Sequence, residues 1–247
     1  MRLKFMTYNI CHGKDFSKAV DEDVVNIVKL DQIANIINKY NPDVVGLNEV
    51  YDKGELPEYE NQAKKIAEMA GYKYYKFAEG FDYEWCNIGN AILSKYPIVK
   101  CEEYHIPTLP ENEREEDTWY EPRVLLVCDL NVDGQIVRVI PTHFGLVDFE
   151  LKSIVKKSSE IIDNTTTPMV LMGDFNVRPN DERLQPLYDR LKSVSKEVGD
   201  NTLTFASYNT YTLIDYFFVS KTAKIISYGV HDERASDHRP LTCEIEF

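Results

Sequence analysis

Apolar residues recur along this chain at two spacings, one typical of strands and the other of helices. Residues 2–10 alternate between polar and apolar, which predicts a strand that ends at Asn9. Short apolar runs at 44–47 and 169–173 lack this alternation, so we expect strands buried on both faces. Helical spacing predicts helices over 23–40, 60–70 and 147–163, and a helix broken by proline over 180–191.

The remaining apolar runs predict strands that are joined by turns. They cover 72–77, 89–94, 99–104, 123–130, 135–142, 211–220, 224–230 and 241–247. Val132-Asp133-Gly134 predicts a hairpin, because Asp-Gly between β-rich runs is a strong turn signal. The stretches 107–122 and 192–209 read as polar loops. The first contains Trp119 and Tyr120, an aromatic pair that could border a substrate site.

This order of elements predicts an α/β protein built in layers, with sheets that are not purely parallel. Helices alternate with strands early in the chain, whereas hairpins dominate its middle. The sequence shows no linker, no low-complexity segment and no repeat of fixed period. We therefore expect a single domain that spans residues 1–247.

Charge and hydropathy narrow the class of protein further. A formal net charge of −13 disfavours tight non-specific binding of nucleic acid, although a small basic patch remains compatible with it. No apolar run approaches the roughly 20 residues of a membrane span. The first residues lack the continuous apolar stretch of a signal peptide. We therefore expect a cytoplasmic protein, or one whose leader has been removed.

The five cysteines are scattered along the chain. They are Cys11, Cys86, Cys101, Cys128 and Cys243, an odd number without a CxxC pair. This pattern favours thiols in a reducing compartment over a disulfide framework. The five histidines are also unclustered, so the sequence predicts no zinc site.

Polar side chains recur where the predicted apolar strands end. They are Asn9, Glu49, His143, and Asp174 with Asn176 in the stretch M-V-L-M-G-D-F-N, while Asp215 lies inside a predicted strand and Asp237 and His238 come just before another. Strand ends are where open α/β sheets place their sites. Gly173 would let the chain turn, and residues two apart on an extended segment point the same way, so we expect Asp174 and Asn176 side by side.

If these strand ends meet, four carboxylates share one cleft, and a hard divalent cation would relieve their repulsion. Mg²⁺ fits such oxygen ligands, Mn²⁺ is possible, and either ion typically serves phosphate chemistry. Each residue alone also has a structural interpretation. Asn9 could cap a turn, Glu49 could pair with a cation, His143 could be a satisfied core histidine, and Asp215 could be a hydrogen-bond hub.

Eight short motifs together resemble one family, the endonuclease/exonuclease/phosphatase superfamily, also described as DNase I-like. They are T-Y-N-I around Asn9, G-L-N-E-V around Glu49, G-N-A-I-L-S-K-Y-P-I from Gly89, E-P-R around Arg123, P-T-H-F around His143, G-D-F-N at 173–176, I-D-Y-F-F around Asp215 and S-D-H-R-P-L at 236–241. Each motif alone is weak. Together they span almost the whole chain in the order that the family uses.

The resemblance implies a four-layer α/β/β/α sandwich of two mostly antiparallel mixed sheets flanked by helices. It also implies hydrolysis of a phosphate ester with a divalent metal, usually Mg²⁺. The implied roles are metal binding for Glu49, Asn9 and Asp237, catalysis for Asp174, Asn176, His143, His238 and Asp215, and substrate binding for Arg123 and Asn90. Asp174 would activate the attacking water, and Asp215 would orient His238.

Two features set this chain apart within the family. Asn48 stands where the family usually has glutamine before the metal-binding glutamate. The arginine-rich insertions of the repair nucleases are absent, and Lys152, Lys156 and Lys157 read as a solvated helix face rather than a nucleic-acid groove.

We therefore favour a monomeric phosphodiesterase acting on a small or lipid-derived diester. The alternatives are a nuclease acting on DNA or RNA, a phosphomonoesterase, and a catalytically idle binding protein.

Overall fold

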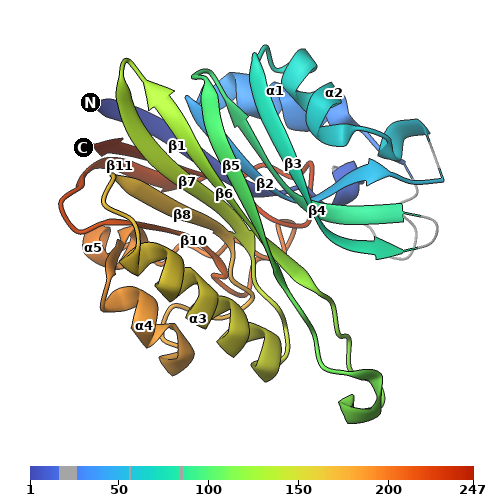
Figure 1. Ribbon diagram of the computed structural model, residues 1–247. Helices are drawn as coiled ribbons and strands as arrows, with labels where there is room; N and C mark the ends of the chain where they lie inside the picture. Colours follow the sequence, from blue (N-terminus) through green and yellow to red (C-terminus); the bar gives the residue numbers. More distant parts are fainter. Residues whose placement is uncertain (17–26, 56, 84–85) are drawn as a thin grey trace.

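Two six-stranded sheets pack face to face in the computed structural model, which describes residues 1–16, 27–55, 57–83 and 86–247 (Figure 1). The first sheet has the order β11-β12-β1-β2-β4-β3, and the second has the order β5-β6-β7-β8-β10-β9. The strands are β1 (Arg2–Asn9), β2 (Val44–Lys53), β3 (Tyr74–Tyr83), β4 (Cys86–Ser94), β5 (Ile98–Ile106), β6 (Arg123–Val132), β7 (Gln135–His143), β8 (Met169–Asp174), β9 (Leu191–Ser193), β10 (Asp215–Ser220), β11 (Lys224–Val230) and β12 (Leu241–Glu246).

Each sheet contains one parallel pair of strands, and its other neighbours are antiparallel. β1 runs parallel to β2, and β7 runs parallel to β8. The two parallel pairs place polar residues in register, since Asn9 is opposite Asn48 and His143 is opposite Asp174. Parallel strands need a crossover connection, and the helices α1 and α3 lie within these two connections.

Helices cover the outer face of each sheet and complete the predicted four layers (Figure 1). The helices are α1 (Leu30–Tyr40), α2 (Gln62–Met69), α3 (Asp148–Asp163), α4 (Gln185–Tyr188) and α5 (Val194–Val198), with short 3-10 turns η1 (Cys11–Gly13), η3 (Pro57–Tyr59), η4 (Glu111–Glu113) and η5 (Glu182–Leu184). Helices α1 and α2 pack on the first sheet, and α3 and α4 pack on the second. A third apolar cluster fills the space between the sheets.

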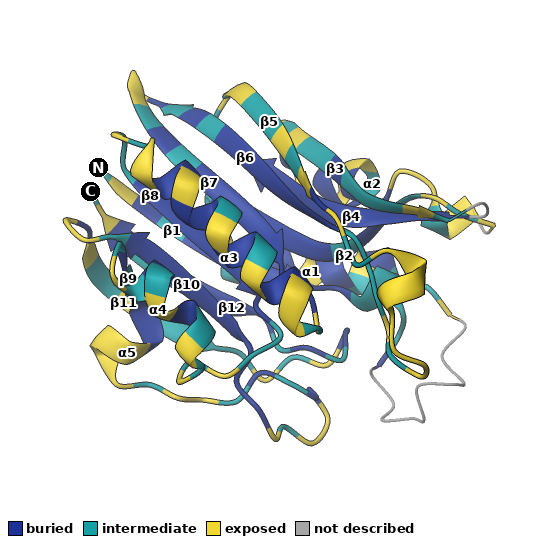
Figure 2. Ribbon diagram, turned by 60° about the horizontal axis from the view of Figure 1, so that its bottom comes forward, coloured by how far each residue is buried: buried dark blue, intermediate teal, exposed yellow. Residues whose placement is uncertain are grey.

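Burial follows this layering (Figure 2). The strands of both sheets are largely buried, whereas α3 exposes one side and buries the other against the second sheet. The buried side includes Leu151, Ile154 and Val155, spaced three and one residues apart as an amphipathic helix requires. None of the described helices is long and apolar enough to cross a membrane.

Some predicted elements differ from those observed. The helix predicted over 23–40 begins at Leu30; its first predicted residues, 23–26, lie outside the described part of the chain. Val28 instead forms an isolated bridge with Lys14. The helix predicted over 180–191 shortens to η5 and α4, because Pro186 in the first turn cannot continue a helix from before it and Leu191 already pairs in β9.

The segments around residue 200 also differ from prediction. Part of the stretch predicted to be irregular, 192–209, forms β9 and α5. The strand predicted over 211–220 begins only at Asp215, because Thr212 pairs with Phe205 outside the sheet. Asp215 is therefore the first residue of β10 rather than an interior one, which places it at the end of a strand.

The prediction that all cysteines are thiols was wrong. Cys101 of β5 and Cys128 of β6 are directly opposite in the antiparallel register, with their Cα atoms 4.3 Å apart, and they form a disulfide. Their separation of 27 residues carries no sequence signal, because strand register alone brings them together. The disulfide removes the basis for expecting a reducing compartment.

Gly173 does not serve the turn that was predicted for it. The strand β8 continues to Asp174, and Gly173 has a φ of +152° within it. A Cβ at this position would lie 1.8 Å from the carbonyl oxygen of Thr142 on β7. Glycine is therefore required so that β8 can approach β7 closely and bring Asp174 beside His143.

Because of the disulfide, we expect fewer reactive thiols than cysteines in each chain. Denatured but unreduced protein should give Ellman's reagent three thiols per chain, from Cys11, Cys86 and Cys243, and five after reduction. Five reactive thiols before reduction would contradict the observed pairing.

Replacing Gly173 with alanine should cost more than about 2 kcal/mol of unfolding free energy, since the backbone of β7 must move to admit the methyl group. Gly80→Ala in β3 is the matched control, because its Cβ would meet neighbours at ordinary distances of 3.5 Å or more. Chemical denaturation should show the control unchanged or more stable by up to about 1 kcal/mol. Equal losses in both variants would refute the close-approach argument.

Candidate active site

The polar residues predicted at strand ends converge where the two sheets meet. Asn9, His143 and Asp174 are the last residues of β1, β7 and β8, and Asp215 opens β10 directly opposite Asp174. All four are buried, with at most 8% of the residue exposed. The prediction that these strand ends meet is therefore confirmed for the described residues.

Glu49 joins this cluster from the interior of a strand and not from a strand end. Strand β2 does not end there but continues to Lys53, and Asn48 and Glu49 together lie opposite Asn90 in a β-bulge. Glu49 has a φ of +54°, which is uncommon for a residue with a side chain. The bulge turns the Glu49 carboxylate toward Asn9, as bulges beside active sites often re-aim a side chain.

Asn9 connects the carboxylates of the two sheets. Its Nδ2 group donates to Glu49 Oε1 at 2.8 Å and to Asp174 Oδ2 at 3.1 Å. Its Oδ1 accepts the backbone N–H of Cys11 at 3.1 Å. In this orientation Asn9 holds Glu49 near Asp174, and its predicted role as a metal ligand stays a prediction.

Asp174, His238 and Asp215 form a buried group in which one histidine lies between two carboxylates. His238 donates from Nδ1 to Asp215 Oδ2 at 2.9 Å, and its Nε2 lies 3.6 Å from Asp174 Oδ2. Burial raises the pKa of Asp174 to about 7, although His238 opposes this and Asp215 adds to it. Burial also acts against the charged form of His238, but the flanking carboxylates outweigh it and raise the pKa of that imidazole. His238 is therefore an imidazolium at neutral pH.

His143 has the opposite electrostatics. Burial lowers its pKa well below the ordinary value, and the neighbouring Arg123 lowers it further. Its Nδ1 lies 3.1 Å from Arg123 Nη1, and its Nε2 lies 3.0 Å from Asn176 Nδ2. Since a neutral imidazole accepts a hydrogen bond at one ring nitrogen only, Arg123 and Asn176 cannot both donate to His143 at once.

Asn176 meets Asp174 through a turn and not through an extended segment. Its φ is +54°, and its backbone N–H donates to Asp174 Oδ1 at 2.8 Å. Its side chain donates to the carbonyl of Phe144. The prediction that Asp174 and Asn176 lie together is confirmed, but the expected extended geometry was wrong because the chain turns back immediately after β8.

Two amides lie beneath these residues. Asn48 is fully buried and donates to Asn90 Oδ1 at 2.7 Å and to the carbonyl of Thr142 at 2.8 Å, while its Oδ1 accepts the backbone N–H of Asp174 at 3.1 Å. Asn90 in turn donates to the carbonyl of Val124. Asn90 is only 2% exposed, so the structure gives it inter-sheet contacts, and its predicted contact with substrate stays a prediction.

Asp237 lies next to His238 in the turn before β12. Its Oδ1 accepts from Ser236 Oγ at 3.0 Å, and its charge helps to raise the pKa of His238. Ser236 also donates to the backbone carbonyl of Asn9, which ties this turn to the end of β1. The predicted metal-binding role of Asp237 stays a prediction.

A pocket of about 390 Å³ adjoins this cluster. Its lining mixes polar with apolar and aromatic side chains and does not include Asp174, Asp215 or His238; the lining residues are His12, Glu49, Tyr51, Tyr83, Ile88, Trp119, Glu121, Arg123, His143, Leu146 and Asn176. Trp119 comes from the loop at 107–122, which therefore borders the pocket as one of the two sequence interpretations expected. The lining contains one arginine and two glutamates, so it is not a basic surface.

Two groups among the described residues could hold a metal ion. One comprises Asp174, Asp215 and His238, and the other comprises Cys11, His12 and Glu49. The sequence analysis did not connect His12 with Glu49, and its expectation that there is no zinc site stays a prediction. The available signal was the position of Cys11-His12 directly after the strand end at Asn9.

The fold and this strand-end site define a DNase I-like α/β sandwich. The model of the Endonuclease/Exonuclease/phosphatase family matches residues 6–238. The chain therefore belongs to that family, as its motifs predicted, and members of the family are phosphoric ester hydrolases that are generally dependent on a divalent metal.

Solved structures of the family share this fold. An endonuclease/exonuclease/phosphatase from Beutenbergia cavernae has a TM-score of 0.76 and 25% identity, over 100% of this chain and 72% of that chain. A family protein from Leptotrichia buccalis has a TM-score of 0.74 and 22% identity, over 99% and 100%. A mannosyl-6-phosphatase from Bacteroides thetaiotaomicron has a TM-score of 0.73 and 18% identity, over 99% and 100%. No curated protein matches the chain.

Ionised Asp174 should destabilise the folded protein at neutral pH. Its pKa rises from 3.8 to about 7 on folding, so the folded state retains a proton that the unfolded state has lost between these values. Stability from this group is therefore lost as the pH rises through that window. In EDTA, Asp174→Asn should gain stability over the wild type by more at about pH 8 than at about pH 5, in thermal or chemical denaturation.

Asp148→Asn is the control for this measurement, because Asp148 is exposed and its hydrogen bonds to Lys152 and Arg183 lower its pKa. A gain for Asp174→Asn that is independent of pH would contradict the raised pKa.

Proposed function

We propose that this protein hydrolyses small phosphodiesters with a divalent cation at Glu49 and a water activated by Asp174. The observation that carries the proposal is the setting of Asp174. Its carboxylate is buried at the end of β8, both oxygens are held by hydrogen bonds, and the Nε2 atoms of His143 and His238 each lie 3.6 Å from Oδ2. Such a carboxylate is oriented and poised for proton transfer.

The side chains around Glu49 suit a cation as ligands better than those around Asp215. Glu49 lines the pocket, and although burial opposes its ionisation, His12 and its other polar neighbours lower its pKa to about 2. At Asp174 and Asp215, by contrast, the His238 imidazolium already neutralises the charge of one of the two carboxylates. A divalent cation held by Glu49 would stabilise charge on the phosphate oxygens and lower the pKa of bound water.

Asp174 is the proposed general base. Its raised pKa is close to neutrality, which favours both deprotonation at working pH and acceptance of a proton from water. The Asn176 N–H holds one carboxylate oxygen, and Asn9 holds the other. The part of Asp174 Oδ2 that faces the two histidines is left for the attacking water. The proton taken from that water would be held on Oδ2.

Two groups with different charge would bind the phosphate. The His238 imidazolium, oriented by Asp215, offers a positive charge and an N–H at Nε2. Neutral His143 and the buried guanidinium of Arg123 lie on the pocket wall, where they would donate to phosphate oxygens as negative charge develops. His238 can also return a proton to the leaving alkoxide.

The pocket favours a compact substrate of low negative charge. Glu49 and Glu121 in the lining repel polyanions, and Lys152 and Lys157 on α3 are paired with Asp148 and Glu160 rather than forming a basic groove. A diester carries one negative charge at its phosphate where a monoester carries up to two. The apolar and aromatic side chains of the lining suit the organic part of the substrate.

Activity assays test this proposal directly. Bis(p-nitrophenyl) phosphate, p-nitrophenyl phosphate and a labelled single-stranded oligonucleotide should be compared with Mg²⁺, Mn²⁺ and EDTA. We expect metal-dependent cleavage that is fastest on the diester. Asp174→Asn should lower kcat by about 10²–10⁴-fold, whereas Asp148→Asn, the same chemical change on the surface of α3, should leave it unchanged.

Other outcomes would replace the proposal. Faster cleavage of the monoester would identify a phosphomonoesterase, and preferred cleavage of the oligonucleotide would identify a nuclease. A fully active Asp174→Asn variant would remove Asp174 from the mechanism.

A further inference from the structure

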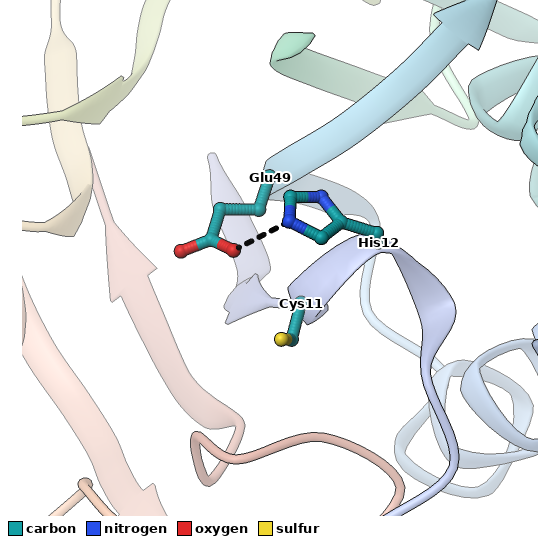
Figure 3. Close-up of side chains that lie close together, drawn as sticks. All are labelled: Cys11, His12 and Glu49. Carbon is teal, nitrogen blue, oxygen red and sulfur yellow. Dashed lines mark ion pairs between the residues drawn. The ribbon is translucent and has the colours of Figure 1, made fainter. Parts of the chain in front are cut away.

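A thiol, an imidazole and a carboxylate meet at the mouth of the site. Cys11 and His12 form the turn that follows β1, and Glu49 projects from the bulge in β2 (Figure 3). His12 Nε2 lies 3.4 Å from Glu49 Oε2, and the ligand atoms of all three residues lie within 4.8 Å of one another. Neither Cys11 nor His12 was among the predicted metal ligands.

The surrounding residues hold this group in place. The His12 ring stacks on Tyr51 with centroids 4.2 Å apart and planes 7° apart. Gln62 Nε2 donates to the His12 carbonyl at 2.7 Å, and the Cys11 N–H donates to Asn9. His12 Nδ1 is buried, so Nε2 is the ring atom that faces Glu49. The group is therefore built by packing and hydrogen bonds rather than by chance proximity on a mobile surface.

All three residues of this group have positive φ angles, which aim their side chains at one another. Cys11 has a φ of 42°, His12 of 59° and Glu49 of 54°, values that residues with a Cβ rarely adopt. A regular turn after β1 would direct Cys11 and His12 elsewhere, and a regular β2 would direct Glu49 to the other face of the sheet. The backbone in both segments therefore departs from its preferred geometry to bring these side chains together.

We propose that Cys11 Sγ, His12 Nε2 and Glu49 bind a borderline transition metal of the Zn²⁺ or Co²⁺ type, in preference to Mg²⁺. Mg²⁺ selects oxygen ligands, whereas sulfur and imidazole nitrogen select zinc and related metals. Three protein ligands with a fourth position left open are typical of catalytic zinc sites. His12 and Glu49 both line the pocket, so the open position would face the substrate space.

Metal binding at this group releases a proton. The Cys11 thiol loses its proton to solvent as the sulfur–metal bond forms, while His12 binds as the neutral imidazole and Glu49 as the carboxylate. This inference extends the cation site of the proposed function. The test uses spectroscopy and measures no turnover. The metal site can therefore be refuted while the proposed hydrolysis stands, and the hydrolysis can be refuted while the metal site stands.

Titration of the metal-free, full-length protein with Co²⁺, under argon and without added thiol, tests the proposal. We expect a sulfur-to-cobalt charge-transfer band in the near ultraviolet that saturates at about one Co²⁺ per chain. Zn²⁺ should abolish the band by displacement, and excess Mg²⁺ should leave it. An unbuffered titration with a pH indicator should register the released proton.

Matched variants assign the ligands. Cys11→Ser should lose the charge-transfer band, and His12→Gln should weaken Co²⁺ binding by at least about tenfold while keeping the band at saturation. Cys86→Ala is the control, because Cys86 is a buried thiol outside the group, and it should retain both band and affinity. Circular dichroism should confirm that each variant is folded.

Two results would overturn the proposal. One is a wild-type protein without a charge-transfer band at saturating Co²⁺, and the other is displacement of Co²⁺ by Mg²⁺ at comparable concentrations. The two proposals can be separated by one combination of results. If the wild type shows no charge-transfer band and folded Cys11→Ser still hydrolyses the diester in Mg²⁺ at the wild-type rate, the diesterase is supported and the thiolate site is refuted.

Discussion

Buried amides hold together carboxylates that come from two different sheets, and the site depends on this constraint. Asn48 reaches from β2 to β7 and β8, where it donates to the carbonyl of Thr142 and accepts from the N–H of Asp174. Asn9 joins Glu49 to Asp174. Amides suit this task because they can donate and accept without adding charge, and because a buried amide without partners would be costly. The shorter Asn48, in place of the family's glutamine, still spans the gap between the sheets.

The balance of charge divides the site into two halves. On one side, a single imidazolium at His238 lies between Asp174 and Asp215 and offsets part of their negative charge. On the other side, Glu49 faces the pocket with His12 and Cys11 beside it. The amide nitrogen of Asn9 lies between the proposed water-activating carboxylate and the proposed cation site. The raised pKa of Asp174 costs stability at neutral pH and suits proton transfer.

Backbone geometry places these groups as much as side-chain chemistry does. Glycine at 173 lets β8 approach β7, and a bulge at Asn48 and Glu49 redirects the carboxylate of β2. Cys11, His12, Glu49 and Asn176 all adopt positive φ within or beside the pocket. Residues in such conformations cluster at functional sites, because the surrounding structure must stabilise them for a reason other than folding. Here they turn side chains from three segments toward a common space.

The sequence by itself determined the layered α/β fold, most strands, and the polar residues that follow them, because apolar periodicity reports burial along a local segment. It also grouped Asp174 with His143 through the rule that strand ends carry sites, whereas it placed Asp215 inside a strand. Only the tertiary structure decided which distant segments meet. Strand register places Cys101 opposite Cys128, where free thiols were expected. Strand β2 continues beyond Glu49 through a bulge. The turn after β1 places Cys11 and His12 beside the Glu49 carboxylate. These outcomes depend on how the two sheets pack against each other. The spacing of residues along the chain does not show which distant segments become neighbours in the folded protein.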